Sequence, residues 1–172
     1  WHFKMNPKDG WNYEPSIGIM ISELPLGSNG DNKRVVISVP KNGFVYVIDA
    51  RTGKYISSNN YVDVNWTTGH DENGRPIYTQ QAQWWKQPPG TKVRIKPGGL
   101  GSHSFDALAY DPSKNVLFIP AMNLDYDYAI PAQNSIGLFG ELGVSITPSE
   151  GRSGKLVAWD PVSQKEIWSV EH

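Results

Sequence analysis

The stretch from Val35 to Ser57, VVISVPKNGFVYVIDARTGKYIS, decides how this chain folds. Its runs Val35–Val39 and Phe44–Asp49 flank the sequence PKNG, and Asn-Gly is typical of a tight hairpin turn because both residues tolerate positive φ. The first run is nearly all β-branched and the second has apolar residues on both faces, as in a strand that is covered on two sides. A second turn leads to a short strand at Lys54–Ser57. The stretch therefore predicts an antiparallel meander that presents Lys41 at its first turn.

The composition favours an all-β domain without a membrane span. The chain has 172 residues, enough for one domain with a hydrophobic core, and combines 12% aromatic residues with 17 glycines and 13 prolines. Its formal charge of -1 argues against binding to nucleic acid or an anionic membrane. No apolar run approaches the roughly twenty residues that a membrane-spanning helix needs. Because the chain begins at Trp1 without a methionine, we expect it to be part of a longer protein.

Two groups of strands are expected, at about residues 16–58 and 102–172, separated by a long connection at about 59–101. An irregular insertion is expected within the second group at about 122–154. Besides the strands of the opening stretch, the pattern predicts the end of a strand at Trp1–Met5 and strands at Ile17–Leu24, His103–Tyr110, Val116–Ala121, Gly154–Asp160 and Lys165–Glu171.

An internal repeat relates the two groups. Asp49 and Asp160 each follow an apolar pair, and each precedes a four-residue turn, a lysine and, two residues later, an isoleucine. Trp1 and Trp168 open similar tails. Repeats of this period indicate a β-propeller or solenoid, in which an outer-strand tryptophan docks flat against the turn of the neighbouring blade. The chain is thus predicted to be an all-β propeller fragment, with two four-stranded blades plus the tail strand of a preceding blade.

These motifs resemble, in the same order, segments of the pyrroloquinoline quinone (PQQ) dependent alcohol dehydrogenases, which are eight-bladed β-propellers of bacterial periplasms. The similar stretches cover nearly the whole chain and are Trp1–Phe3, Trp11–Tyr13, Pro40–Phe44, Val62–Thr68, Gly101–Tyr110, Ile119–Asn123 and Gly154–His172. The resemblance implies that residues 1–172 form a partial PQQ-repeat propeller domain, about a quarter to a third of a full family member.

The resemblance also implies a chemistry. In that family PQQ lies at the centre of the propeller with Ca²⁺ or a lanthanide, and a primary alcohol is oxidised to an aldehyde by hydride transfer to the quinone. An aspartate accepts the hydroxyl proton, while a lysine or arginine hydrogen-bonds the quinone oxygens. The implied partners are the alcohol substrate, the remaining blades of the parent protein and a cytochrome c as electron acceptor. The implied location is the periplasm.

Three residues match cofactor or metal positions of the family. Lys41 falls on the quinone-contacting lysine or arginine, where a cation stabilises negative charge on the quinone oxygens. Ser104, in the sequence GSHS, falls where the family's G-x-H-N offers an asparagine to the cofactor, and its hydroxyl can still donate one hydrogen bond. Glu14 falls where lanthanide-using relatives place an extra metal-binding carboxylate. The alternative for Lys41 and Glu14 is an ordinary solvated charge on a loop.

Asn12 departs from the family pattern. By the W-x-Y spacing it falls on the catalytic aspartate, and an amide cannot accept a proton at neutral pH. Asp9 lies three residues earlier, where the family has a carboxylate that is not the base. The sequence therefore leaves two interpretations open. The chain supplies rim loops to the site of a PQQ-dependent alcohol dehydrogenase and is inactive by itself, or its parent is a non-catalytic PQQ-repeat propeller that acts as a binding or scaffold module.

Two further features receive structural interpretations. His103 has no second histidine or cysteine at metal-ligand spacing, so we expect it to be a hydrogen-bonded structural residue. The pair Trp84-Trp85 could form a shelf for a cofactor, but surface packing over the neighbouring blade is the preferred interpretation.

Overall fold

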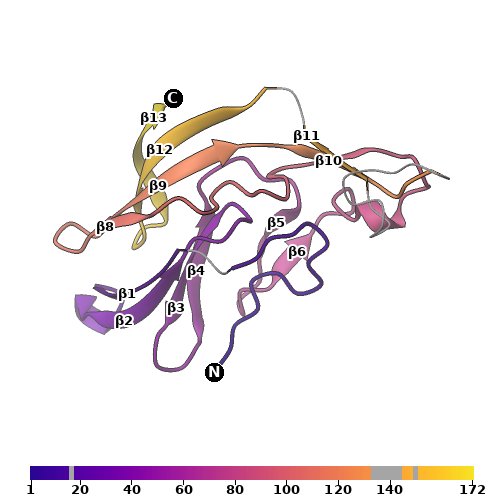
Figure 1. The fold of residues 1–172 in the computed structure, drawn as a ribbon. Helices are drawn as coiled ribbons and strands as arrows, with labels where there is room; N and C mark the ends of the chain where they lie inside the picture. The colour runs from indigo at the N-terminus through magenta and orange to yellow at the C-terminus, as the bar shows by residue number, and fades with distance from the viewer. Residues whose placement is uncertain (16–17, 133–144, 149–150) are drawn as a thin grey trace.

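The computed structural model describes residues 1–15, 18–132, 145–148 and 151–172, and two four-stranded antiparallel sheets dominate it (Figure 1). Blade one contains β1 (Ile19–Leu24), β2 (Lys33–Ser38), β3 (Phe44–Asp49) and β4 (Tyr55–Asn60). Blade two contains β8 (Ala109–Asp111), β9 (Val116–Asn123), β12 (Ser153–Asp160) and β13 (Lys165–Glu171). The described residues include 3₁₀ turns at Ser28–Gly30 and Trp84–Lys86 but no α-helix, and none of them forms a helix able to cross a membrane.

The meanders confirm the predicted propeller fragment, with two corrections. β3 and β13 have the predicted bounds. The strand predicted at His103–Tyr110 is wrong over most of its length. Only its end pairs, as β8, because Ser102 donates to the Lys41 carbonyl and the His103 ring bonds the Val39 carbonyl instead of joining a ladder. The second correction concerns Trp1–Met5, predicted to be the end of a strand: these residues belong to no strand and pair with none in the described part of the chain. Ile17, predicted to lie in β1, falls outside the described residues.

The connection and the insertion hold more order than their composition predicts. The connection contains the hairpin of β5 (Thr67–His70) and β6 (Pro76–Tyr78), followed by β7 (Val93–Ile95). β7 pairs with β10 (Tyr126–Ala129) of the insertion, and β10 also pairs with β11 (Ser145–Pro148). The expectation of an irregular segment is therefore wrong for these strands, while residues 133–144 and 149–150 lie outside the described part.

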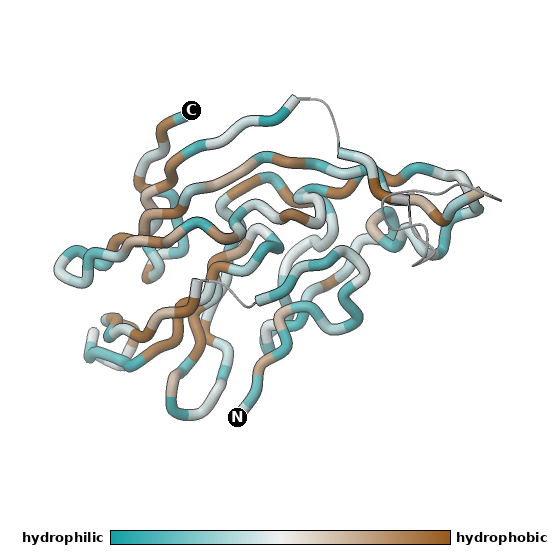
Figure 2. Tube along the Cα trace, viewed as in Figure 1, coloured by the Kyte–Doolittle hydropathy of each residue, from teal (hydrophilic) through white to brown (hydrophobic). Residues whose placement is uncertain are grey.

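The central strands of blade one, β2 and β3, are covered on both faces, as their sequence predicts, whereas Ile19 and Ile21 of the edge strand β1 are 61% and 60% exposed. Aliphatic residues of β2 and β3 pack against those of blade two. The cluster includes Val35, Ile37 and Val47 of blade one and Leu117, Ile119 and Val157 of blade two. The opposite face carries an aromatic cluster that the N-terminal loop and the connection complete; among its members are Trp11, Tyr13, Phe44, Tyr46 and Trp66. Figure 2 shows the hydrophobic stretches along the strands of both sheets. The Lys41 turn lies between these two cores.

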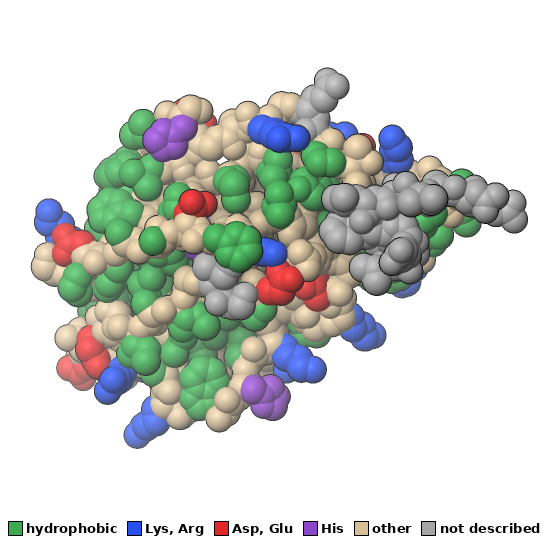
Figure 3. All heavy atoms as spheres, in the orientation of Figure 1, with side chains coloured by type: hydrophobic (Ala, Val, Ile, Leu, Met, Phe, Trp, Pro, Cys, Tyr) green, Lys and Arg blue, Asp and Glu red, His purple; other side chains and the backbone are tan. Residues whose placement is uncertain are grey.

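Within the described part of the chain, blade two is covered on one face only. On its other face Phe118 of β9 and Trp168 of β13 have ring centroids 5.9 Å apart, and Trp168 is 43% exposed. Val170 on the same outer strand is 57% exposed. Figure 3 shows hydrophobic side chains at the surface over the sheets. Such a face is what a blade presents to the next blade in a propeller.

The predicted repeat appears in the backbone as well. Each blade has a bulge at the same point of its third strand, between Val47 and Ile48 and between Ala158 and Trp159. The Asp49 carboxylate accepts the N–H groups of Arg51 and Thr52, and the Asp160 carboxylate accepts that of Val162. Both turns then end on a residue with positive φ, which is Gly53 (φ 73°) in blade one and Gln164 (φ 57°) in blade two. The aspartates therefore fix equivalent turns.

The two turns receive different partners. The Trp1 indole lies over Gly53, where an added Cβ would be 2.6 Å from a ring atom, and its Nε1 donates to the Ala50 carbonyl over 3.0 Å. At the repeat position of the tryptophan, blade one has Ser57, whose Oγ accepts from the Gln164 amide over 3.2 Å. A polar pair thus replaces the tryptophan–glycine contact between the two blades of this chain.

Replacing Gly53 by alanine is expected to cost about 1 kcal/mol more than replacing Gly30 by alanine. Both glycines have positive φ, but an added Cβ at Gly30 meets nothing within 4 Å, whereas at Gly53 it meets the Trp1 indole. Urea unfolding of the two variants measures the difference. Equal losses of unfolding free energy would show that Trp1 contributes nothing by lying on this turn.

Candidate cofactor-contact site

Lys41 is a buried cation at the β2–β3 turn. Gly43, with φ 91°, closes the turn, and only a residue without Cβ reaches this conformation without strain. The Lys41 side chain is 8% exposed, and its Nζ lies 2.5 Å from a carboxylate oxygen of Glu14, whose side chain is 47% exposed. The interpretation of Lys41 as a solvated turn lysine is therefore wrong. A buried ammonium needs an anionic or strongly polar partner, and the partner here belongs to the neighbouring loop.

The loop Gly99–Ser104 closes over the Lys41 turn. Gly101 has φ 84°, and an added Cβ there would be 2.6 Å from the Lys41 Cβ, so the close approach requires glycine. The Ser102 N–H donates to the Lys41 carbonyl over 3.0 Å. Ser104, two residues further on, is 6% exposed, and its Oγ has no hydrogen-bond partner among the described residues. An unpaired buried hydroxyl indicates a place for a missing partner.

Asn12 reaches the same loop from the N-terminal segment. It has φ 76°, and its Nδ2 donates to the Gly99 carbonyl over 3.2 Å. The Asp9 carboxylate accepts the backbone N–H groups of Trp11, Asn12 and Tyr13, so both of its oxygens hold the loop in shape. Asp9 therefore has a structural role here. The structure brings Asn12, Glu14, Lys41 and Ser104 to adjoining loops.

Asn42, directly after Lys41, is fully buried and forms hydrogen bonds through both its side chain and its backbone. Its Nδ2 donates to the Asn6 Oδ1 and to the Tyr46 hydroxyl, each over 2.8 Å. Its Oδ1 accepts the Phe44 N–H over 3.1 Å, and its carbonyl accepts the Trp66 Nε1 over 2.9 Å. Because both the side chain and the backbone of Asn42 are engaged, the turn that carries Lys41 is held from several sides.

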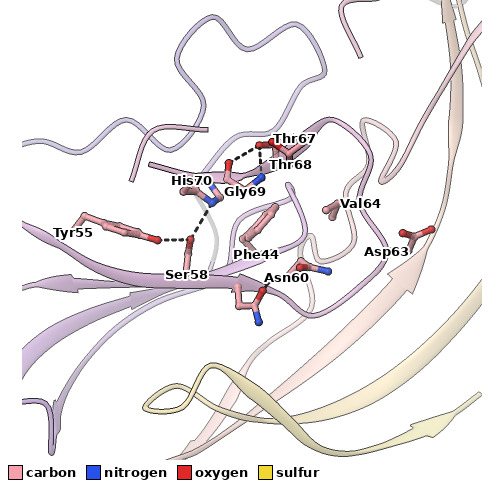
Figure 4. Close-up of a pocket in the computed structure, with 11 residues that line it drawn as sticks. Phe44, Tyr55, Ser58, Asn60, Asp63, Val64, Thr67, Thr68, Gly69 and His70 are labelled. Atoms are coloured by element: carbon pink, nitrogen blue, oxygen red, sulfur yellow. Dashed lines mark hydrogen bonds between the residues drawn. The ribbon is translucent and has the colours of Figure 1, made fainter. Parts of the chain in front are cut away.

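His70 lies beyond Tyr46, at the edge of a pocket of about 320 Å³ between β4 and β5 (Figure 4). Its Nε2 is 2.8 Å from the Tyr46 hydroxyl, and its Nδ1 is 3.1 Å from the Ser58 Oγ, which in turn meets the Tyr55 hydroxyl over 2.9 Å. Burial disfavours the charged ring and lowers the pKa of His70 to about 4. The ring is therefore neutral near pH 7.

The polar groups around this pocket are largely committed to one another. Asn59 donates to the Gln164 carbonyl, Asn60 to the Val62 carbonyl, and Asp63 pairs with Lys96 over 3.0 Å. Few groups are left to select a ligand, so the pocket is a structural crevice beside the His70 network.

Of the residues with structural interpretations, His103 lies as expected. Both ring nitrogens of buried His103 contact carbonyl oxygens, those of Val39 and Asp106. Trp84 and Trp85 do not pack over the neighbouring blade as expected but against the N-terminal loop: Trp84 donates its Nε1 to the Gly10 carbonyl, and Trp85 packs against Gly10 and Trp11. The described residues contain no group of three or more carboxylate, histidine or cysteine side chains that could hold a metal ion, and Glu14, the predicted metal ligand, faces Lys41.

Sequence reasoning missed the network of Asn42, Tyr46 and His70. Tyr46 belongs to the apolar alternation of β3, and His70 lies in a connection without clear periodicity. The one available signal was the polar side chain of Asn42 in an otherwise apolar hairpin, and the Asn-Gly turn accounts for it without any further role.

The chain is similar over its whole length to curated and solved alcohol dehydrogenases. It is 36% identical to 1-butanol dehydrogenase (cytochrome c) of Thauera butanivorans and 37% identical to the dehydrogenase subunit of the alcohol dehydrogenase (quinone) of Komagataeibacter europaeus. It covers 26% and 25% of these proteins, and all of this chain is matched. The crystal structure of quinohemoprotein alcohol dehydrogenase from Comamonas testosteroni matches all of the chain with a TM-score of 0.87 and 30% identity, over 27% of its own length.

A europium-containing methanol dehydrogenase has the same fold over 99% of this chain and 30% of its own, with a TM-score of 0.81 and 21% identity. No family model matches the chain. The chain spans about a quarter of the length of the curated relatives that it matches. The two repeated blades and these relatives agree: by sequence and fold, the chain is similar over its whole length to one segment of the β-propeller of quinoprotein alcohol dehydrogenases.

Proposed function

We propose that this chain forms one wall of the PQQ site in a dehydrogenase that oxidises a primary alcohol to an aldehyde. Lys41 and Ser104 are the proposed cofactor contacts. The observation that carries the proposal is that adjoining loops hold a buried ammonium, that of Lys41, and a buried hydroxyl, that of Ser104, which has no hydrogen-bond partner among the described residues. The relatives named as dehydrogenases favour this function over a scaffold role. The proposed domain is the whole of residues 1–172, with blades at about 16–58 and 102–172.

The residues present fit an anionic quinone. Bound PQQ would supply a carbonyl that accepts hydride from the alcohol carbon. The Lys41 ammonium, held in a buried position, would stabilise the negative charge that develops on the quinone oxygens, where water cannot screen it. The free Ser104 hydroxyl would donate one hydrogen bond to a cofactor oxygen.

Two further residues, Glu14 and Asn12, are assigned to the metal site and to the position of the base. Glu14 is the proposed contribution to a Ca²⁺ or lanthanide site, because its carboxylate is the hard oxygen ligand that such ions prefer. Its contact with Lys41 would then be exchanged for the metal, and the other ligands would come from blades outside this chain. Asn12 occupies the proposed position of the base. Its amide can hold the alcohol by a hydrogen bond but cannot take its proton, which would pass to water as the hydride leaves the alcohol carbon.

The partners follow from the relatives. We infer a cytochrome c as electron acceptor, since the 1-butanol dehydrogenase and the lupanine 17-hydroxylase carry that name in their descriptions. The remaining blades of the parent propeller would cover the open face of blade two, and the proposed location is the periplasm.

Replacing Lys41 by methionine is expected to lower PQQ affinity about 10- to 100-fold, because it removes a charge-assisted hydrogen bond from a buried site. Quenching of tryptophan fluorescence by added PQQ, in the whole protein that contains this chain, gives the affinity. Lys41→Arg is the matched control, since it keeps the cation and is expected to lose less than the methionine variant. Equal affinities of the wild type and Lys41→Met, or no PQQ binding by the wild type, would overturn the proposal.

A further inference from the structure

The segment Trp66–His70 holds the Lys41 turn through hydrogen bonds to Asn42. Trp66 donates its Nε1 to the Asn42 carbonyl, and His70 reaches the Asn42 side chain through the Tyr46 hydroxyl. We propose that His70, acting through Tyr46 and Asn42, is a positioning residue for Lys41. This inference rests on the proposed function, because it assigns His70 to the site in which Lys41 contacts the quinone.

The donors and acceptors of this hydrogen-bond network have one consistent assignment. The two Nδ2 hydrogens of Asn42 go to Asn6 and to the Tyr46 oxygen, so Tyr46 accepts from Asn42. The Tyr46 hydroxyl hydrogen then needs an acceptor, and the one available among its described contacts is the His70 Nε2. The neutral ring consequently carries its hydrogen on Nδ1 and donates it to the Ser58 Oγ. Every hydrogen in this buried path has a place only while His70 is neutral.

Protonation of His70 would break this order. A hydrogen on Nε2 would point at the Tyr46 oxygen, and the Tyr46 hydroxyl hydrogen would lose its acceptor inside the protein, where Tyr46 is fully buried. An unpaired buried hydroxyl is costly. Tyr46 would have to rotate or withdraw, and the hydrogen bond that fixes the Asn42 amide would weaken with it. The position of Lys41, one residue before Asn42, would loosen.

The surroundings of His70 favour the neutral ring. Phe44 and Tyr46 meet its faces edge-on from β3, with ring centroids 4.6 and 5.2 Å away, and Tyr55 approaches from β4. Asp71, the next residue, is the nearby anion, and it is exposed and accepts the N–H groups of Asn73 and Arg75. Asp63 lines the same pocket but pairs with Lys96. No carboxylate in the described structure bonds the ring.

Two substitutions separate positioning from general stability. His70→Gln can place an amide oxygen where Nε2 was and accept from Tyr46, whereas His70→Asn reaches only the Ser58 side. Neither side chain titrates. Hydrogen exchange is measured in the whole protein on the segment Val39–Val45, which contains the Phe44 N–H that bonds Asn42. The segment 155–159 in the central strand of blade two is the internal control.

At pH 7, His70→Asn is expected to exchange about tenfold faster than the wild type in Val39–Val45, with no change in 155–159, and His70→Gln is expected to stay near the wild type. Lowering the pH from 7 to 5 should accelerate this segment in the wild type, after correction for intrinsic exchange, but not in His70→Gln. Equal behaviour of the two variants at pH 7, or a change in 155–159 at pH 7 as large as that in Val39–Val45, would overturn the positioning role.

PQQ affinity distinguishes this inference from the function on which it rests. His70→Asn is expected to weaken binding about tenfold and His70→Gln to restore most of it. If Lys41→Met leaves affinity unchanged, the proposed function fails whatever the exchange experiment shows. If Lys41→Met weakens binding while His70→Asn does not, the positioning inference alone is overturned.

Discussion

Replacing Asn12 by aspartate is expected to raise the kcat of alcohol oxidation about 100- to 1,000-fold, in the whole protein that contains this chain and is loaded with cofactor. The amide at this position donates to the Gly99 carbonyl and has no basic lone pair for a proton. A carboxylate cannot donate to that carbonyl, so it is released toward the alcohol and supplies the missing base. Turnover is measured by dye-linked oxidation of a primary alcohol.

The control for this experiment is Asn12→Ala, which also loses the Gly99 contact but gains no base. Its kcat should stay near that of the wild type. The aspartate variant should in addition show a kcat that rises with pH as the new carboxyl group ionises, a dependence that the alanine variant lacks. If the aspartate and alanine variants turn over equally fast while both bind PQQ, Asn12 does not occupy the position of the base.

The second large effect concerns stability and pH. The pKa of His70 is lowered by burial from 6.5 to about 4 in the folded state. Between these values the unfolded chain binds more protons than the folded one, so stability is fully present above about pH 6.5 and is lost as the pH falls toward 4. Because the ring is partly exposed and solvent screens it, this group alone is expected to remove on the order of 1 to 2 kcal/mol of unfolding free energy by pH 4.

Urea unfolding of the wild type and His70→Gln at pH 7.5, 6, 5 and 4 measures this loss, with tryptophan fluorescence as the signal. Carboxylates titrate in both proteins, so the difference between the two pH profiles isolates His70. The wild type should lose stability relative to His70→Gln over this range, and a constant difference would show that the ring titrates alike in the folded and unfolded states.

The sequence predicted the blades because their signals are local. β-branched runs, the Asn-Gly turn and the spacing around Asp49 and Asp160 depend on residues within one hairpin, and the structure keeps the same bulge and the same positive φ in both. The strand predicted at His103–Tyr110 failed for the opposite reason. Its apolar pattern was overridden by distant contacts, where backbone and ring groups of residues 102 and 103 bond to the Lys41 turn.

For the candidate site, too, local motifs identified the residues, whereas their burial and partners depend on distant contacts. The sequence by itself identified Lys41, Ser104, Glu14 and the substitution at Asn12, because each lies in a short motif that can be compared with a family. Only the tertiary structure decided that Lys41 is buried and paired with Glu14, and that His70 supports its turn through Tyr46 and Asn42. Burial and hydrogen-bond partners join residues 24 to 27 positions apart, and no local pattern records which distant side chain will complete a buried polar group.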